Sequence, residues 1–137
     1  MEAPTDQNGK KRILFVDDEP AILTSLKNLL RKDRNRWDMV FALGGQLGLD
    51  AVRERPFDVV VSDLRMPEVD GATLLSAVKD ECPTTIRIML SGYADEESLA
   101  RARPALHQLL LKPCDVATLR TAIECSIDAF GDPNRPH

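Results

Sequence analysis

The chain has 137 residues, of which 43% are hydrophobic and 29% are charged. This length and composition are typical of one globular domain and exclude a disordered chain, a coiled coil and a collagen-like fibre. Lysine and arginine total 18 against 22 aspartate and glutamate residues, so the net charge is −4. A protein held to nucleic acid or to an anionic membrane mainly by charge would carry the opposite sign, so we expect no direct nucleic-acid partner.

The sequence also predicts where the protein works. No apolar run approaches the roughly 20 residues that cross a membrane, and the first residues lack the layout of a signal peptide. We therefore expect a cytoplasmic protein with no membrane partner. The three cysteines, Cys82, Cys114 and Cys125, contain no Cys-x-x-Cys pair. They predict reduced, mostly buried thiols rather than a metal site.

Short apolar runs of strand length recur between two polar ends. We expect a flexible N-terminal tail over residues 1–10, one domain over 11–130, and a C-terminal tail or the start of a linker over 131–137. The predicted strands are Ile13–Val16, Met39–Leu43, Phe57–Val61, Ile86–Leu90 and Leu109–Leu111.

The segments between these runs carry apolar residues at helical spacing. Two further helices, over Gly45 to Arg55 and over Asp95 to Arg103, rest on weaker patterns, and Pro104 ends the second. The three clear apolar stripes are Ile22, Leu26 and Leu29; Leu74, Leu75, Val78 and Cys82; and Val116, Leu119, Ile123, Ile127 and Phe130. Alternating strands and helices predict the doubly wound α/β class, a parallel sheet with helices on both faces.

Polar residues follow four of the predicted strands directly: Asp17-Asp18-Glu19, Ser62-Asp63, Ser91 and Lys112-Pro113. Taken singly, each has an ordinary explanation: a helix cap, a turn or a solvated strand end. In a parallel sheet, however, the carboxyl ends of the strands face one crevice, where ligands bind. The combination of these groups therefore predicts a functional site.

The chemistry of these residues points to phosphoryl transfer. Three neighbouring carboxylates repel one another unless they bind protons or a cation, and a few hard oxygen ligands suit Mg²⁺. A carboxylate can act as the nucleophile toward a phosphoryl group while a metal ion and a lysine neutralise its charge. Asp63, Mg²⁺ and Lys112 fit these roles.

Other chemistries of the same fold lack their motifs. No G-x-G-x-x-G follows the first strand, and Gly44-Gly45-Gln46-Leu47-Gly48 lacks the Lys and Ser/Thr of a P-loop. There is also no G-x-S-x-G nucleophile elbow around Ser91. Dinucleotide, nucleotide and esterase chemistry are therefore disfavoured.

The same positions match a known family. Asp17-Asp18, the run Asp63-Leu64-Arg65-Met66-Pro67-Glu68-Val69-Asp70-Gly71, Ser91 and Lys112-Pro113 resemble the motifs of a bacterial two-component response-regulator receiver domain. The chain is similar to chemotaxis-type receivers from Lys11 to Ala129. The resemblance implies a flavodoxin-like, five-stranded parallel sheet of order 2-1-3-4-5 with five helices.

The resemblance also implies a role for each site residue. Asp63 would accept a phosphoryl group from the phosphohistidine of a sensor histidine kinase or a phosphorelay protein, and Lys112 would contact a phosphoryl oxygen. Asp18 would bind Mg²⁺ directly and Asp17 directly or through water, with the backbone carbonyl of Arg65 as the remaining protein ligand. Ser91 would move to hydrogen-bond the phosphoryl group and carry the switch, and Lys112-Pro113 would form a cis peptide.

The chain departs from the family pattern at Leu109, where receivers commonly have an aromatic residue. We therefore expect the signal to travel through Ser91, the following loop and the next helix, with Leu109 in the core or on a partner-facing surface. The segment from Ser91 to Lys112 also looks slightly short for the family. Arg65 and Tyr93 stand at the two positions that flank the phosphoryl group, and we hypothesise that they shield it from water.

The leading hypothesis is a signalling switch rather than an enzyme, with chemistry limited to autophosphorylation from phosphodonors and autodephosphorylation. The alternatives are a Mg-dependent phosphatase that uses Asp63 as nucleophile, and a phosphorylation-independent pseudo-receiver. Phosphatases of the haloacid-dehalogenase type have a second aspartate where this chain has Arg65, which weighs against turnover. The receiver would signal to an output domain or a downstream protein, either as a stand-alone domain or as part of a longer protein. A homodimer through the fourth helix, fifth strand and fifth helix is also common in the family.

Overall fold

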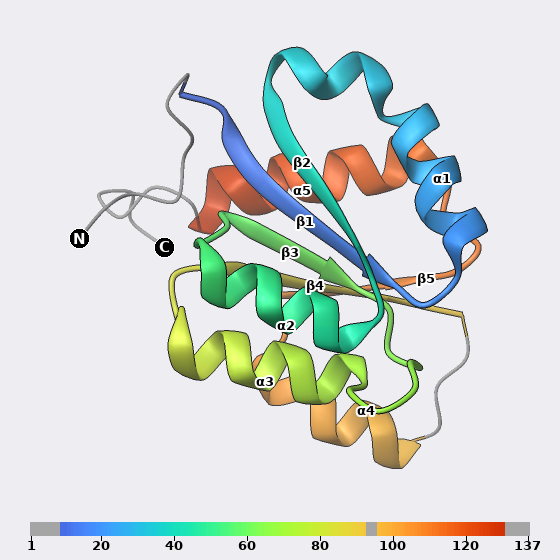
Figure 1. Cartoon of the computed structure of the whole chain (residues 1–137), viewed down its shortest axis with the longest axis vertical. Coiled ribbons are helices and arrows are strands. Elements are labelled where there is room, and N and C mark those ends of the chain that lie inside the picture. Colours follow the sequence, from blue (N-terminus) through green and yellow to red (C-terminus); the bar gives the residue numbers. More distant parts are fainter. Residues whose placement is uncertain (1–8, 93–95, 131–137) are drawn as a thin grey trace.

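A computed structural model describes residues 9–92 and 96–130. Its centre is a parallel sheet of five strands in the order β2-β1-β3-β4-β5 (Figure 1). This is the doubly wound, flavodoxin-like order, so the predicted fold class is confirmed. The strands are β1 (Lys11–Asp17), β2 (Trp37–Leu43), β3 (Val59–Ser62), β4 (Ile86–Ser91) and β5 (Gln108–Leu111).

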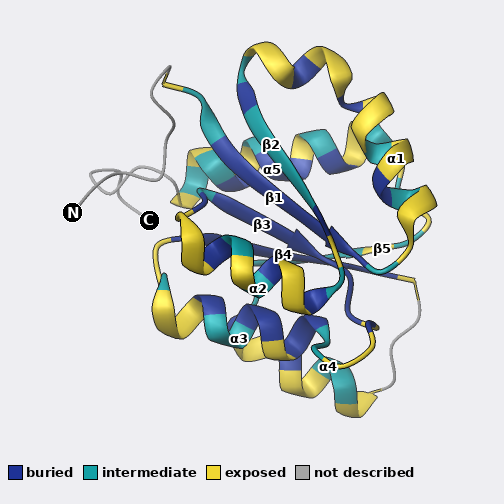
Figure 2. Ribbon diagram, viewed as in Figure 1, coloured by how far each residue is buried: buried dark blue, intermediate teal, exposed yellow. Residues whose placement is uncertain are grey.

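The strands are buried because helices cover both faces of the sheet. α2, α3 and α4 lie on one side and α1 and α5 on the other (Figure 1). Figure 2 shows the sheet buried between helices whose outer faces are exposed. Parallel strands covered in this way lose the polar alternation of one-sided sheets, so the sequence showed them as continuous apolar runs. The helices are α1 (Pro20–Leu29), α2 (Gly45–Glu54), α3 (Gly71–Glu81), α4 (Glu96–Ala102) and α5 (Val116–Phe130).

Some predicted boundaries were wrong. Phe57 lies before β3 rather than in it, where its buried ring is covered by the guanidinium of Arg12, 4.2 Å from the ring centroid. The helix predicted over Gly45 to Arg55 ends one residue early. The helix predicted from Asp95 begins at Glu96 in the structure, and Asp95 itself lies outside the described residues.

The predicted apolar stripe of α1 was partly wrong. Leu29 is 51% exposed, whereas Leu23 and Leu30 are buried. Leu26 does pack against the buried cluster on this face of the sheet. The buried stripe is therefore turned toward Leu23 and Leu30. The stripe predicted for α3 is confirmed, with Leu74, Leu75 and Val78 buried and Cys82 half-buried.

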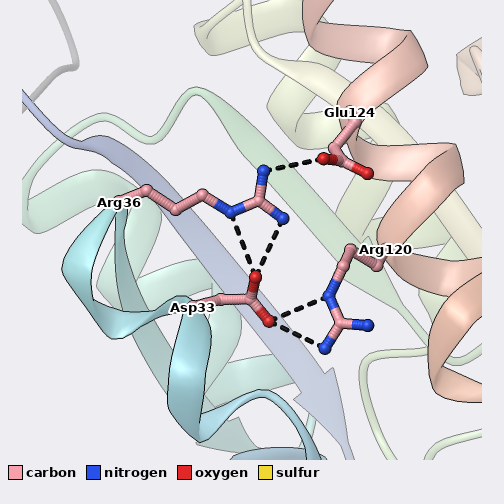
Figure 3. A network of polar contacts seen from close by, with 4 residues as sticks. All are labelled: Asp33, Arg36, Arg120 and Glu124. Carbon is pink, nitrogen blue, oxygen red and sulfur yellow. Dashed lines mark hydrogen bonds and ion pairs between the residues drawn. The ribbon is translucent and has the colours of Figure 1, made fainter.

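A short 3-10 helix, η1 (Arg31–Asn35), follows α1 and was not predicted. Its Asp33 is buried and accepts hydrogen bonds from Arg36 at 2.8 and 3.0 Å and from Arg120 of α5 at 2.9 and 3.0 Å. Arg36 also donates to Glu124 at 2.7 Å (Figure 3). This network fastens η1 to α5. A second 3-10 helix, η2 (Arg103–Ala105), carries Pro104 after α4.

The remaining predictions concern the ends, the cysteines and membrane segments. Nearly all of the predicted tails lies outside the described residues. The cysteines are free, as predicted, but they are not mostly buried: Cys82 and Cys114 are half-buried and Cys125 is exposed. Within residues 9–92 and 96–130, no helix is both long enough and apolar enough to cross a membrane.

Candidate functional site

The carboxyl ends of the strands bring the predicted site residues to one edge of the sheet. Asp17 ends β1, Asp63 directly follows β3, Ser91 ends β4 and Lys112 directly follows β5. The parallel register sets the ends of neighbouring strands level: Val16 lies opposite Ser62, and Ser91 lies opposite Leu111. The structure thus confirms the predicted convergence.

Three carboxylates form the centre of the site. Oxygen atoms of Asp17, Asp18 and Asp63 all lie within 4.8 Å of one another. Asp17 is 4% exposed and Asp63 is 9% exposed, so water screens their charges only partly. Three hard oxygen ligands so close together are a suitable partial shell for a divalent cation such as Mg²⁺.

Lys112 supplies the neighbouring positive charge. Its Nζ donates to Oδ2 of Asp17 at 3.2 Å and lies 3.5 Å from Oδ2 of Asp63. Burial raises the pKa of Asp63 and so does the Asp17 carboxylate; Lys112 opposes them, but the pKa stays above its usual value. Burial alone would lower the pKa of Lys112, but the carboxylates of Asp63 and Asp17 outweigh it and raise that pKa. The site therefore keeps a charged lysine beside the Asp63 carboxylate, whose pKa burial has raised.

The backbone fixes the orientation of Asp63. Its Oδ1 accepts a hydrogen bond from the backbone N–H of Leu64 at 2.8 Å, and its own N–H donates to the carbonyl of Val16 at 3.0 Å. Gly71 donates from its N–H to the carbonyl of Leu64 at 2.8 Å. A Cβ atom on Gly71 would collide with the carbonyl oxygen of Asp63, so only glycine allows this close approach.

Asp17 is held locally as well. Its Oδ1 accepts a hydrogen bond from the backbone N–H of Glu19 at 3.0 Å. Glu19 is the N-cap residue of α1, and no side chain caps that helix. The alternative that Asp17 or Asp18 serves as the cap of α1 was therefore wrong.

An open pocket of about 450 Å³ lies beside the acidic cluster. Asp18 and the exposed Arg65 line it together with Asp70, whose side chain caps α3 by accepting from the N–H of Thr73 at 2.8 Å. Arg101 of α4 donates to Oδ2 of Asp70 at 3.1 Å. Burial raises the pKa of Asp70, but hydrogen bonds from Thr73 and Arg101 outweigh burial and lower it.

The sequence did not reveal this connection between α4 and the site loop, which is the segment of residues 63–70 between β3 and α3. Asp70-Gly71 was used only as part of the run that resembles the family, although an aspartate just before an apolar helical stripe is an N-cap signal. Arg101 could not be found in this way, because nothing local marks a partner that is 31 positions away.

The remaining predicted positions are Ser91, the Lys112-Pro113 peptide, Leu109 and Tyr93. Ser91 is buried at the end of β4, and its carbonyl accepts from the N–H of Lys112 at 2.8 Å. The Lys112-Pro113 peptide is cis, as predicted. Leu109 is half-buried and packs against the core cluster under α3 and α4. Tyr93 lies outside the described residues.

Comparison with known protein families matches residues 13–124 to the response regulator receiver domain. Over 115 residues, the chain is 34% identical to the transcriptional regulatory protein ZraR of Escherichia coli O157:H7, covering 82% of this chain and 25% of that protein. Over 128 residues, it is 34% identical to the sensor kinase CckA of Brucella abortus (strain 2308), covering 90% of this chain and 13% of the kinase.

Solved structures agree with these matches. The signal receiver domain of an HD domain-containing protein from Pseudomonas fluorescens Pf-5 superposes with a TM-score of 0.82 at 30% identity, covering 89% of this chain and 98% of that one. A CheY-like receiver domain protein from Methanospirillum hungatei JF-1 also gives a TM-score of 0.82, at 28% identity, covering 89% and 97%. The chain spans a quarter or less of the length of the two curated relatives above. It belongs to the response regulator receiver domain family.

Proposed function

We propose that the chain is a phosphorylation-activated switch in which Asp63 is the phosphoacceptor. An oxygen of its carboxylate attacks the phosphorus of a phosphohistidine on a sensor histidine kinase or a phosphotransfer protein. The new O–P bond forms as the N–P bond breaks, and the electron pair returns to the imidazole. The observation that carries this proposal is the position of Asp63, which is partly desolvated, oriented by the backbone N–H of Leu64, and 3.5 Å from Lys112.

In this proposal, Lys112 and a divalent cation together neutralise the negative charge of the transferred phosphoryl group. The carboxylates of Asp17, Asp18 and Asp63 fit Mg²⁺ because they are hard oxygen donors within 4.8 Å of one another, and the backbone carbonyl of Arg65 is the further proposed ligand. Mg²⁺, when bound, supplies positive charge at the phosphoryl oxygens. Lys112 is already held in place by Asp17 and needs no rearrangement to meet the transferred group.

Ser91 is the proposed switch residue. Its position at the buried end of β4, with its carbonyl bonded to the N–H of Lys112, places it beside the phosphoacceptor edge. Leu109 stands where receivers commonly have an aromatic residue, and it packs against the core. In this proposal the conformational change therefore passes from Ser91 to the following segment and to α4. α4 is joined to the site loop by the pair between Arg101 and Asp70, so displacement of α4 requires that this pair break.

The proposed chemistry stops at gain and loss of one phosphoryl group, so the chain is not a turnover enzyme. A phosphatase would use Asp63 in the same way but would need a general acid near the leaving group. The residue two positions after Asp63 is the exposed Arg65, which supplies no such acid. The phosphatase and the pseudo-receiver remain distinguishable outcomes of the experiment below.

We propose that the partners are a phosphodonor protein and an output domain or downstream protein, in the cytoplasm. Two observations support a homodimer through α4, β5 and α5. Leu111 of β5 is 69% exposed, and a groove of about 420 Å³ runs between β5 and α5, lined partly by Leu110 and Ala122. Sedimentation with and without beryllofluoride tests this dimer.

Intact mass after incubation with acetyl phosphate and Mg²⁺ tests the proposed function. We expect one phosphoryl adduct in the parent protein and none in Asp63→Asn or without divalent cation. The matched control is Asp80→Asn, an exposed carboxylate on α3, which should be phosphorylated normally. Continuous phosphate release without an accumulating adduct would favour the phosphatase. Neither an adduct nor beryllofluoride binding would favour the pseudo-receiver.

The lifetime of the adduct tests the role of Arg65. Its exposed side chain lines the pocket beside Asp18, from where it can cover the phosphoryl group. We expect faster loss of phosphate in Arg65→Ala than in the parent, by about threefold or more, because attacking water gains access. Arg103→Ala, an exposed arginine outside this pocket, should leave the half-life unchanged. An equal half-life in all three proteins would contradict shielding.

A further inference from the structure

A second groove, of about 440 Å³, lies along the outer strand β2. β2 is the edge strand of the sheet, and the segment from α1 through η1 runs beside it (Figure 1). The groove begins where the strands begin, since Trp37 lies opposite Lys11 in the register of β1 and β2. The acidic cluster lies at the carboxyl ends of β1 and β3. The lining residues are Lys10, Lys27, Arg34, Trp37, Asp38, Met39 and Phe41.

The floor of this groove is apolar and firmly positioned. Trp37, Met39 and Phe41 alternate along β2, so their side chains point to the same face of the sheet. Met39 and Phe41 are only half-buried. The ring of Phe41 stacks on Phe15 of β1 with centroids 5.1 Å apart. A partner side chain would therefore meet a preformed apolar surface, which reduces the entropy cost of binding.

The rim of the groove is positively charged. Lys27 and Arg34 are exposed and form no ion pair with any residue of the described chain. The acidic lining residue, Asp38, accepts a hydrogen bond from Nε of Arg12 at 3.1 Å. Asp33, next to Arg34 in sequence, is turned inward to Arg36 and Arg120 (Figure 3). Around the apolar floor, a chain of net charge −4 thus presents two basic side chains, Lys27 and Arg34, that no ion pair within the described residues neutralises.

β2 adds a third feature, a free strand edge. Seven residues, Trp37–Leu43, pair with β1 on one side, and no strand of the described sheet pairs with them on the other. Such an edge accepts an extended segment through main-chain hydrogen bonds, while alternate side chains enter the neighbouring pocket.

We propose that this groove binds an extended acidic segment of a partner protein, with an apolar side chain seated between Met39 and Phe41. The basic rim selects an acidic partner because electrostatic complementarity speeds encounter and disfavours like-charged competitors. A single-stranded nucleic acid fits less well. It needs open aromatic faces, whereas Trp37 is 4% exposed and the guanidinium of Arg36 lies over its ring at 4.0 Å.

The segment would bind independently of phosphorylation, because the groove lies along the outer strand β2, whereas the acidic cluster stands at the carboxyl ends of β1 and β3. Binding of the segment therefore does not depend on the proposed role of Asp63, and each can be tested without the other. An Asp63→Asn protein should bind the segment as the parent does.

The test is a titration of the ¹⁵N-labelled full chain with a capped peptide in which glutamate and leucine alternate, followed by two-dimensional NMR. We expect shifts at Lys27, Arg34 and Phe41, and weaker binding as salt rises. Arg34→Glu should raise Kd about tenfold or more, because it reverses a charge on the rim. Arg103→Glu is the matched control: it makes the same change, also at an exposed position of a 3-10 helix, and should bind like the parent.

Lys27→Glu repeats the test from α1, so that a folding defect at η1 cannot decide the result. Thermal unfolding of each variant checks its stability. Equal Kd values in the parent, Arg34→Glu and Lys27→Glu would overturn the proposal. An absence of shifts at the groove would also overturn it, as would tighter binding there of a mixed-sequence oligonucleotide or of a control peptide in which lysine replaces every glutamate. In those cases the basic side chains would serve only to guard the strand edge against aggregation.

Discussion

Asp18 adds a third carboxylate beside those of Asp17 and Asp63. Its carboxylate lies within 4.8 Å of those of Asp17 and Asp63, and Lys112 pairs with those two. We expect Asp18→Asn to raise the melting temperature of the metal-free protein, because it removes repulsion between like charges. Mg²⁺ should stabilise the parent by about 1.4 kcal/mol at ten times its Kd, and the variant by much less.

Calorimetry at matched ionic strength, with and without Mg²⁺, measures both effects. Asp80→Asn, which removes a charge on the exposed face of α3, should respond to Mg²⁺ as the parent does. A variant that gains as much stability from Mg²⁺ as the parent would remove Asp18 from the proposed ligands.

The residues of the site were predictable where strand ends carry them. Asp17 and Lys112 stand directly after an apolar run and Asp63 stands one residue further on, and a parallel sheet must bring such positions together. The pair between Asp70 and Arg101 was not predictable, because it depends on how α4 packs against the loop before α3. Sequence patterns identify positions on an element, whereas contacts between elements need the packed structure.

At the scale of the element, α1 shows where helical periodicity is ambiguous. Apolar residues at 22, 23, 26 and 29 of this ten-residue helix, with Leu30 as its C-cap, fit two overlapping stripes. The prediction chose the stripe that ends at Leu29, but packing against the sheet buries Leu23 and Leu30 instead. A short helix contains too few turns for the pattern to decide between neighbouring stripes.

Two adjacent leucines give a direct test of this packing. Leu30 is 0% exposed and Leu29 is 51% exposed. We expect Leu30→Ala to lower the free energy of unfolding by about 2–5 kcal/mol, through lost burial and a cavity. Leu29→Ala should change it by no more than about 0.5 kcal/mol. Urea unfolding measures both, and equal losses would show that α1 is rotated from its position here.

The network around Asp33 joins two elements that are distant in the sequence, η1 and α5. Burial raises the pKa of Asp33, but hydrogen bonds from Arg120 and Arg36 outweigh it, so the pKa lies below its usual value. We expect Asp33→Ala to cost about 3 kcal/mol of stability, because it leaves the largely buried Arg120 without this acceptor. The measurement is urea unfolding at pH 7.

The exposed pair of Arg53 and Glu81 is the matched control, since it also joins two helices through a guanidinium and a carboxylate, at 3.0 Å. Arg53→Ala should change stability little, because water screens an exposed pair. A similar loss in both variants would mean that burial does not strengthen the Asp33 network.

The Asp33 network could not be predicted from the sequence, because Asp33 and Arg120 are 87 positions apart and η1 has no apolar pattern.

Across the whole molecule, the end of α5 is fastened to the sheet far from the acidic cluster. Nδ1 of His107 accepts a hydrogen bond from the backbone N–H of Arg87 at 2.9 Å, and its ring lies against Phe130, the last residue of α5, with centroids 4.8 Å apart. The buried guanidinium of Arg87 donates to the carbonyls of Ala105 and Thr85 at 2.7 and 2.9 Å. A neutral imidazole thus connects β4, the start of β5 and the end of α5.

This contact makes the stability of the whole fold sensitive to mild acid. Burial and the nearby Arg87 lower the pKa of His107, so the unfolded chain binds a proton more readily than the folded one. The contribution of His107 is therefore complete above the unfolded pKa of about 6.5 and is lost as pH falls through the lower, folded value. We expect the free energy of unfolding to fall between pH 7.5 and 5.5 in the parent. The fall should be smaller in His107→Asn, whose amide oxygen can accept the same hydrogen bond without titrating. Urea unfolding across this range measures the difference, and parallel pH profiles in the two proteins would show that His107 does not carry it.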